Sequence, residues 1–337
     1  SLSPRVRPWP LPAEIWDYLD GGSGHGRTRG DNERAFEAIT LKPRPLADLR
    51  GAHTSTMLFG RELAHPLLLA PVAYQRLFDA QGEVGVAMAA AAQHTPFIVS
   101  SLASQPLTDI AAAGADLWFQ LYWQAGRDAS LRLLRRAEHA GAQAIVFTVD
   151  APVKQATLVL PDGVVAANLE PASSPAAVPD GGSIVFDRWM AVAPRWEDLD
   201  WLRQQTRLPL LVKGLLYADD AQRAVDAGCD GLVVSNHGGR ILDGTPTSLN
   251  VLREFRQRLP ASLPLLFDSG VRSGQDVFKA IAAGAQAVLV GRPYLWGLAA
   301  AGPMGVAHVI RLLRDELEMT MALTGCRTVA SIANESQ

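Results

Sequence analysis

The chain has 337 residues, of which 48% are hydrophobic and 19% charged, which allows a large buried core and excludes an intrinsically disordered protein. The formal net charge of −3 argues against nucleic acid as a partner, and two isolated cysteines, Cys229 and Cys326, exclude a disulfide framework. No leader-like segment opens the chain and no run approaches the roughly 18 apolar residues of a membrane span, so we expect no membrane association and a cytoplasmic location. Because the chain begins at Ser1 rather than Met, an address could have been lost with the natural terminus.

Short apolar runs followed by turn or polar residues recur along the chain, as the buried strands of a parallel sheet do. They are Pro66–Ala73, Phe97–Ser101, Asp116–Tyr122, Ala144–Asp150, Pro209–Gly214, Gly231–Asn236, Pro264–Gly270 and Ala287–Arg292. Amphipathic stretches of helix length lie between them, among them Gly82–His94, Asp128–Ala140, Ala218–Ala227 and Ser273–Ala283. Eight such units predict one α/β domain over residues 1–337, a TIM (β/α)₈ barrel. A doubly wound open sheet alternates similarly, but the count and the absence of a GxGxxG turn after the first strand favour the barrel.

Two segments lie outside this alternation. Residues 1–65 precede the barrel and contain one expected helix, around Ala13–Leu19, which would flank or cap it. Residues 161–183, after the fourth strand, are rich in Pro, Gly, Ala and Ser and are too long for an ordinary connection. This long loop is predicted to be a mobile lid or a disordered surface loop, and its composition fits an inert insertion equally well.

Polar residues end five consecutive predicted strands. Active sites of such barrels lie at the C-terminal ends of the strands, so these residues are informative. They are Ser100 and Ser101, Gln120 and Tyr122, Thr148 and Asp150, Lys213, and then Ser235, Asn236 and His237. A single Lys or Asp in such a place is usually a solvated strand end, but five strands in succession predict a shared pocket.

The seventh and eighth strands end in glycine and arginine. Asp268, Ser269 and Gly270 are followed by Arg272, and the eighth strand ends in Gly291 and Arg292. Glycine lets backbone N–H groups approach an anion, and arginine is a two-pronged donor. These loops are the usual phosphate site of the fold, so we predict a phosphate pocket. The alternative is two surface arginines beside turn glycines.

The run SNHGGRILDG, residues Ser235–Gly244, follows the sixth strand. His237 lies three residues before Arg240 with two glycines between them, so a titratable base and a carboxylate-binding guanidinium can share one loop. This pairing suits an anionic substrate. The other histidines lack such company, and no HxH or HExxH spacing occurs, so we expect no metal site.

The motifs SNHGGR, LVKG, FDSGVR and GRPYLWGL resemble those of the FMN-dependent 2-hydroxy-acid oxidising family, which includes glycolate oxidase, lactate oxidase, mandelate dehydrogenase and hydroxymandelate oxidase. The likeness runs from about Ile15 to about Cys326, and its motifs are specific. The resemblance implies FMN as cofactor, oxidation of a small 2-hydroxy acid to a 2-oxo acid, and assembly as a homotetramer or octamer.

The resemblance also implies roles for individual side chains. His237 would remove the hydroxyl proton of the substrate, and Asp150 would stabilise the resulting imidazolium. Arg240 and Tyr18 would bind the substrate carboxylate, and Tyr122 would lie near its hydroxyl. Hydride would pass from Cα to flavin N5, although a route through a Cα carbanion uses the same residues.

Flavin contacts carry over in the same way. Lys213 would lie near the N1–O2 edge of the ring, where a cation stabilises reduced flavin. The remaining expected contacts with flavin or its phosphate are Pro71, Val72, Ala73, Ser100, Gln120, Thr148, Ser235, Asp268, Ser269, Gly270, Arg272, Gly291 and Arg292.

Two positions depart from the family pattern. Leu102 stands where several members have tryptophan, which should enlarge the pocket and lower selectivity for the shortest acids. The family's second active-site arginine has no clear counterpart after Asp150. Either Lys154 takes part of its role, or carboxylate binding rests more on Arg240 and Tyr18, or the chain lacks mobile residues here.

The run APVAYQRL, with Tyr74 and Arg76, resembles the hydroxymandelate oxidase branch. The leading substrate is therefore mandelate or 4-hydroxymandelate, with a benzoylformate-type product, and the alternative is glycolate or lactate. Tyr74, Phe78 and Trp123 would form an aromatic wall or equally be core or interface packing. The chain has no cytochrome domain and no apolar membrane insertion near the lid, which favours dioxygen over the acceptor of a mandelate dehydrogenase.

Three other functions account for fewer of these sequence features. An isopentenyl diphosphate isomerase would share the phosphate loops but would not need SNHGGR. A flavin-binding protein without catalysis would explain the missing arginine, but it would not need both His237 and Arg240. A structural barrel without cofactor leaves the polar strand ends and the paired arginines unexplained.

Overall fold

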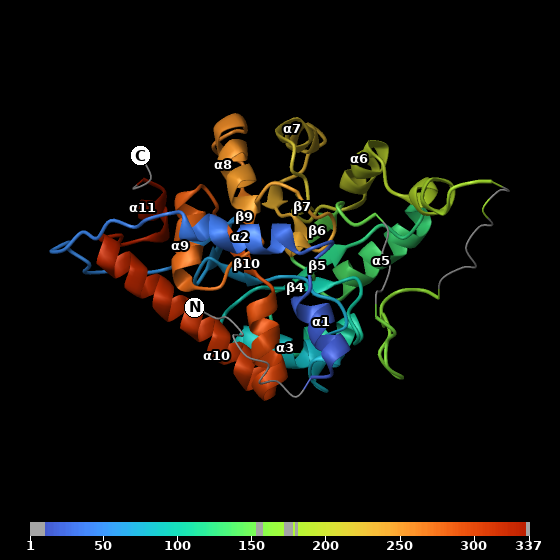
Figure 1. Cartoon of the computed structure of the whole chain (residues 1–337), viewed down its shortest axis with the longest axis horizontal. Helices are drawn as coiled ribbons and strands as arrows, with labels where there is room; N and C mark the ends of the chain where they lie inside the picture. The colour runs from blue at the N-terminus through green and yellow to red at the C-terminus, as the bar shows by residue number, and fades with distance from the viewer. Residues whose placement is uncertain (1–10, 153–157, 172–177, 179–180, 335–337) are drawn as a thin grey trace.

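Parallel strands close into a barrel in the computed structural model, which describes residues 11–152, 158–171, 178 and 181–334 (Figure 1). The strands follow chain order around the barrel, and β10 pairs with β3 to close it. They are β3 (Leu67–Leu69), β4 (Phe97–Ser100), β5 (Leu117–Leu121), β6 (Ile145–Thr148), β7 (Leu210–Lys213), β8 (Gly231–Val234), β9 (Leu265–Phe267) and β10 (Ala287–Val290). The predicted TIM barrel is confirmed.

Each barrel strand is followed by a helix that packs outside it. The helices are α3 (Gly82–Ala92), α4 (Leu107–Ala112), α5 (Arg127–His139), α6 (Trp196–Gln205), α7 (Ala218–Asp226), α8 (Ser248–Arg258), α9 (Gly274–Ala282) and α10 (Arg292–Thr324), and α11 (Val329–Asn334) ends the described chain. Among the described helices, α10 alone is long and apolar enough to cross a membrane by length and composition. It is kinked at Ala301 and Gly302 and packs on α3 and α9, as a core helix of the barrel does.

The barrel strands alternate between two apolar environments, which explains their continuous apolar sequences. Leu68, Ile98 and Leu266 belong to the cluster inside the barrel, whereas Val99 and Phe147 pack under the helices. Because side chains alternate along a strand, the positions two residues beyond the inner apolar layer point into the barrel mouth. These positions are Ser100, Gln120, Thr148, Lys213, Ser235 and Asp268.

The N-terminal segment holds more structure than the one expected helix. Besides α1 (Ala13–Asp20) it contains α2 (Arg27–Glu37), which contacts η4 (His237–Gly239) at the C-terminal end of the barrel. The prediction of a single helix was wrong because α2, RTRGDNERAFE, has no apolar stripe and contains a glycine. Tertiary contacts fix it instead, since the buried amides of Asn32 and Asn236 bond to each other at 2.8 and 2.9 Å.

A short hairpin closes the opposite end of the barrel. Its strands are β1 (Thr56–Leu58) and β2 (Arg61–Leu63), and both Leu58 and Leu63 join the interior cluster. Phe59 at the turn lies against Trp118, with 5.9 Å between ring centroids. The mouth at the other end is therefore where a ligand can enter.

The described part of the long loop after β6 is anchored to the barrel. The buried Asn168 side chain accepts a hydrogen bond from the N–H of Leu107 at 2.8 Å and donates one to the carbonyl of Gln105 at 2.9 Å. The chain then passes through a short π-helix, η2 (Ile184–Trp189), and a 3-10 turn, η3 (Met190–Val192), to α6. Residues 172–177 and 179–180 lie outside the described residues, so the mobile lid over 161–183 stays a prediction.

Candidate functional site

A cavity opens at the C-terminal mouth of the barrel. Its empty space is about 1330 Å³, part of it open to solvent, which is room for a cofactor and a small substrate. Predicted site residues that line it are Tyr18, Pro71, Val72, Ala73, Ser100, Leu102, Tyr122, Lys213, His237, Arg240, Asp268, Ser269, Gly270, Arg272, Gly291 and Arg292. Gln120, Thr148 and Ser235 are buried at the same strand ends, and Asp150 contacts His237. The structure thus brings the predicted site residues together.

His237 and Asp150 form the pair at the centre of this cavity. The His237 Nδ1 lies 2.9 Å from Oδ1 of Asp150 and 3.1 Å from Oδ2. Because a carboxylate only accepts, Nδ1 carries the proton and the lone pair of the neutral ring is on Nε2. The Tyr122 hydroxyl lies 3.4 Å from Nε2, which is too long for a strong hydrogen bond and leaves Nε2 free to engage a substrate.

Ionisation of the neighbouring groups supports this arrangement. Burial would raise the pKa of Asp150, but the charge and hydrogen bond of His237, helped by Lys213, hold that pKa below its ordinary value. Burial raises the pKa of Tyr122, and the Asp150 charge adds to the rise. Asp150 is therefore ionised and Tyr122 protonated at neutral pH.

Gly214 makes room for Asp150, a role that sequence reasoning missed. Its φ is +105°, and a Cβ at this position would lie 2.5 Å from Cγ of Asp150. Gly214 is the last residue of the LVKG motif, so the sequence contained a signal for it. Only the fold shows that this glycine faces the Asp150 carboxylate. Gly214 therefore fixes where Asp150, and through it the His237 ring, can lie.

Ser235 begins the loop of residues 235–240 that carries His237, called the catalytic loop below, and it links this loop to the floor of the cavity. Its Oγ accepts hydrogen bonds from Lys213 Nζ at 3.0 Å and from the N–H of His237 at 2.9 Å. The same hydroxyl donates to Oδ2 of Asp268 at 2.6 Å. Lys213 is 3% exposed, so its ammonium is held at a fixed point beneath the pocket.

The loop after β9 is also tied to the catalytic loop. Ser269 has a φ of +102°, which is strained for a residue with a side chain, and its Oγ accepts the N–H of Gly238 at 3.0 Å. Gly270 lines the cavity, but its missing Cβ has another reason, because a Cβ there would lie 2.7 Å from the carbonyl oxygen of Asn32. The position must be glycine because α2 approaches the backbone there closely. This reason is independent of any approach of an anion.

The C-terminal end of α1 holds two arginines of the cavity. Arg240 Nη1 donates to the Tyr18 carbonyl at 2.7 Å, and its guanidinium lies 5.1 Å from the centre of the Tyr18 ring. The Leu19 carbonyl accepts from Arg240 at 3.3 Å and from Arg292 at 3.2 Å, and the Gly21 carbonyl from the same two at 3.3 and 2.7 Å. Carbonyls at a helix C-terminus suit such cations.

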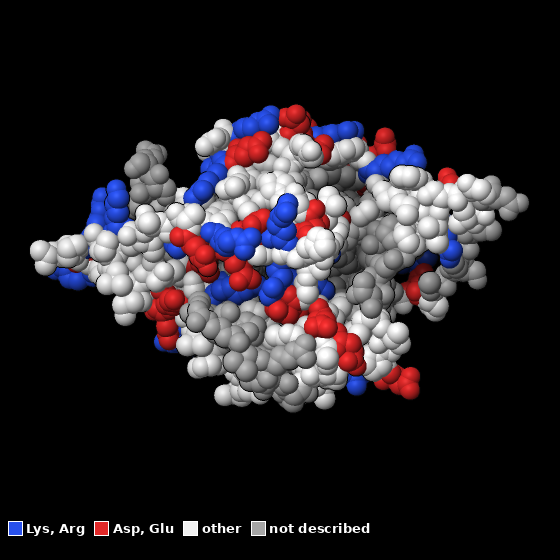
Figure 2. All heavy atoms as spheres, viewed as in Figure 1, with Lys and Arg blue, Asp and Glu red and all other residues white. Residues whose placement is uncertain are grey.

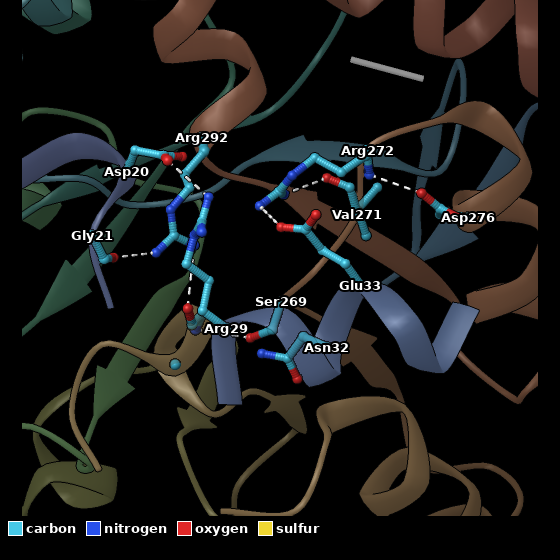
Figure 3. A network of polar contacts seen from close by, with 12 residues as sticks. Asp20, Gly21, Arg29, Asn32, Glu33, Ser269, Val271, Arg272, Asp276 and Arg292 are labelled. Carbon is cyan, nitrogen blue, oxygen red and sulfur yellow. Dashed lines mark hydrogen bonds and ion pairs between the residues drawn. The ribbon is translucent and has the colours of Figure 1, made fainter. Parts of the chain in front are cut away.

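Arg272 and Arg292 approach one region of the cavity from different elements (Figure 3). Arg272 donates to the Val271 carbonyl and to Oε1 of Glu33, both at 2.8 Å. Burial lowers the pKa of Arg272, and burial followed by the charges of Arg272 and Arg240 lowers the pKa of Arg292 to about 9. Buried positive charge in excess favours an anionic ligand here.

Further features show a site shaped for a ligand. Gln120 Nε2 and Thr148 Oγ1 are buried and have no hydrogen-bond partner among the residues that the structure describes. A Cβ on Gly291 would meet nothing closer than the Ala70 Cβ at 3.9 Å, so it would project into open space. Flavin mononucleotide has a ring with polar edges and an anionic phosphate. Gln120, Thr148 and Lys213 suit the polar edges of such a ring, and the arginines suit the phosphate. The fold and site therefore define a barrel oxidoreductase that binds a flavin nucleotide.

The aromatic wall is not part of the cavity lining. Phe78 stacks on Tyr18 with 6.4 Å between ring centroids, and Trp123 packs edge-on against Trp201 at 6.0 Å. Tyr74 is half-buried and is not among the residues that line the cavity. Lys154, considered as a substitute for the missing arginine, lies outside the described residues.

Comparison with known proteins gives the family. The sequence profile of the FMN-dependent dehydrogenases matches residues 9–337. The L-lactate oxidase of Alicycliphilus denitrificans is 47% identical over 98% of this chain and 94% of its own, and the 4-hydroxymandelate oxidase of Amycolatopsis orientalis is 46% identical over 95% and 92%. A mandelate oxidase solved with (S)-2-phenylpropionate has a TM-score of 0.86 at 44% identity, covering 96% of this chain and 93% of that one. The chain belongs to the FMN-dependent dehydrogenase family, and its cofactor is FMN.

Proposed function

We propose that this FMN-dependent (S)-2-hydroxy-acid oxidase oxidises mandelate or 4-hydroxymandelate to a benzoylformate-type 2-oxo acid, with dioxygen as electron acceptor. The observation that carries the reaction class is the loop that presents His237, paired with Asp150, beside Arg240 in one cavity. The names of the relatives support both an aromatic substrate and the alternative, lactate.

The substrate carboxylate is assigned to Arg240 and Tyr18. Among the described residues Arg240 bonds to carbonyls through Nη1, which leaves Nη2 and Nε for a substrate. Burial raises the pKa of the Tyr18 hydroxyl, which keeps it protonated and able to donate. Two donors therefore converge on a carboxylate without the second arginine of the family pattern.

The proton of the 2-hydroxyl group goes to Nε2 of His237. The imidazolium that forms donates Nδ1–H to Asp150, whose negative charge stabilises it. Tyr122, kept protonated, orients the substrate oxygen through its hydroxyl. Bound FMN supplies the two-electron acceptor, and Lys213 with the strand-end groups would hold its ring.

The phosphate of FMN would bind between Arg272 and Arg292. Both guanidinium groups are buried, and the Gly291 position leaves open space beside them. The partners that Arg272 and Arg292 now have are carbonyls and Glu33. A phosphate offers them a charged acceptor in addition.

An apolar lining favours a substrate with an apolar side chain. Leu102, Val72 and Ile241 line the cavity together with Ala73. Leu102 is half-buried and is smaller than tryptophan, so it leaves space for an aryl ring. Assembly as a tetramer or octamer and a cytoplasmic location stay predictions.

An anaerobic titration tests this function. Mandelate and 4-hydroxymandelate are expected to bleach the flavin at least tenfold faster than lactate or glycolate, because the pocket is apolar. Faster reduction by lactate would make the small-acid alternative correct. Admitting air then tests the acceptor: rapid return of the colour with hydrogen peroxide supports the oxidase, whereas reoxidation by a quinone alone would make it a dehydrogenase. A flavin that no 2-hydroxy acid reduces would contradict the function.

A further inference from the structure

Among the described residues, a third arginine lies beside the two that face the phosphate region. Arg29 is in the first turn of α2 and reaches up next to Arg292, as Figure 3 shows. Its charge contributes to the lowered pKa of both Arg272 and Arg292, after burial and other neighbours, so the three guanidinium groups interact electrostatically.

Contacts of the backbone fix the position of Arg29. Gly239 of the catalytic loop has a φ of +74°, and a Cβ on it would lie 2.5 Å from the backbone nitrogen of Arg29. On the other side, the N–H of Ser23 donates to the Gly239 carbonyl at 2.8 Å. The start of α2 is therefore held directly against the loop that carries His237.

Arg29 is incompletely bonded in this position. Its Nη2 donates to Oδ2 of Asp20 at 2.8 Å. Arg29 Nε and Asp20 Oδ1 are both buried and have no partner among the residues that the structure describes. The side chains are 32% and 19% exposed, so the pair is partly buried, and the charges of both side chains act on Arg292, which lines the cavity. Such a donor can serve a further acceptor.

The charges of Arg29, Arg272 and Arg292 are not cancelled by their acidic partners. Asp20 pairs with Arg29 and Glu33 pairs with Arg272, while Arg292 bonds to carbonyl groups of Leu19, Gly21 and Gly238. Figure 2 shows acidic and basic side chains intermixed at the centre of this face, where Figure 1 places α2. Among Arg29, Arg272 and Arg292 one positive charge is left over, and a phosphate would compete with Asp20 for Arg29.

We propose that Arg29 is a third cation that anchors the phosphate of FMN, and that Asp20 weakens this anchor by competing for the guanidinium. The proposal rests on the proposed placement of the phosphate between Arg272 and Arg292. It predicts opposite effects for two partners of one ion pair, which a merely structural ion pair would not give.

The test measures the Kd of the apoprotein for FMN and for riboflavin, which lacks the phosphate, by quenching of flavin fluorescence. Arg29→Gln is expected to weaken FMN binding about tenfold and to leave riboflavin binding unchanged, because only FMN carries the charge. Asp20→Asn is expected to tighten FMN binding. Arg34→Gln is the matched control, since Arg34 lies on the same helix in a surface pair with Asp31 and should change neither Kd.

Equal weakening of both flavins by Arg29→Gln would overturn the proposal in favour of a structural role for the ion pair. Weaker FMN binding by Asp20→Asn would overturn it too. Arg272→Gln separates this failure from that of the phosphate placement. If Arg272→Gln weakens the binding of FMN but not of riboflavin, and Arg29→Gln does not show this difference, then Arg29 is not an anchor and the placement of the phosphate stands. If neither variant weakens FMN binding more than riboflavin binding, the placement of the phosphate between Arg272 and Arg292 is wrong.

Discussion

Asp150 and Gly214 approach each other so closely that a Cβ on the glycine would lie 2.5 Å from Cγ of the carboxylate. Asp150 in turn lies 2.9 Å from Nδ1 of His237, so the space at Gly214 determines the orientation of the proposed base. The two residues follow neighbouring strands, β6 and β7, whose pairing is fixed by the barrel.

Gly214→Ala is therefore expected to displace Asp150 and slow flavin reduction by the substrate on the order of tenfold or more, as misplacement of a catalytic group does. Stopped-flow absorbance under anaerobic conditions measures this rate. Gly141→Ala is the matched control, because its φ of +90° imposes similar backbone strain but nothing lies within 4 Å of the new Cβ. Equal rates in the two variants would show that contact with Asp150 is unimportant.

Asp150→Asn keeps the shape of the side chain and removes its charge. The imidazolium of His237 then loses its stabilising partner, so flavin reduction should slow by about 10²-fold or more while FMN content is maintained. An unchanged rate would exclude Asp150 from proton transfer.

Leu102→Trp tests the assignment of the aromatic substrate. The larger side chain fills space in the cavity, so kcat/KM for mandelate should fall by roughly 10- to 100-fold and that for glycolate much less. Leu102→Ile conserves volume and serves as control. A parallel loss for both acids would indicate general damage to the pocket, and no loss would place the aryl ring elsewhere.

His65 predicts a pH dependence of stability away from the site. It is fully buried, and burial, partly opposed by its hydrogen bond to Gln93, lowers its pKa from 6.5 to about 4. The unfolded chain therefore binds more protons between these values, and stability is fully present above pH 6.5 and is lost as the pH falls toward 4. The loss amounts to roughly 3 kcal/mol for this group.

Urea unfolding of the wild type and His65→Gln at pH 7 and pH 4.5 isolates this contribution, because both proteins share the remaining titratable groups. The variant should be less stable at pH 7, and the difference should shrink at pH 4.5. A difference that is the same at both values would rule out His65 as the source.

The sequence predicted the barrel and most of the cavity because both depend on local pattern. The polar residues that end the apolar runs predicted Gln120 and Lys213 at the barrel mouth, and the structure finds both buried near the C-terminal ends of their strands. The hydrogen bonds of Arg240 and Arg292 to carbonyls at the end of α1 could not be predicted. They join residues far apart in the chain, and a backbone carbonyl carries no sequence signal. Arg29 was missed for a related reason, because α2 is polar and is held by tertiary contacts.

The central claim is that His237 is the base of a flavin-dependent oxidation. Its most direct test is the anaerobic rate of FMN reduction by mandelate in the wild type and His237→Asn, with FMN content measured in both and in Arg272→Ala. We predict that His237→Asn retains FMN and is reduced on the order of 10³-fold more slowly, whereas Arg272→Ala loses FMN. Reduction of His237→Asn at the wild-type rate, or equal loss of FMN from both variants, would contradict the claim.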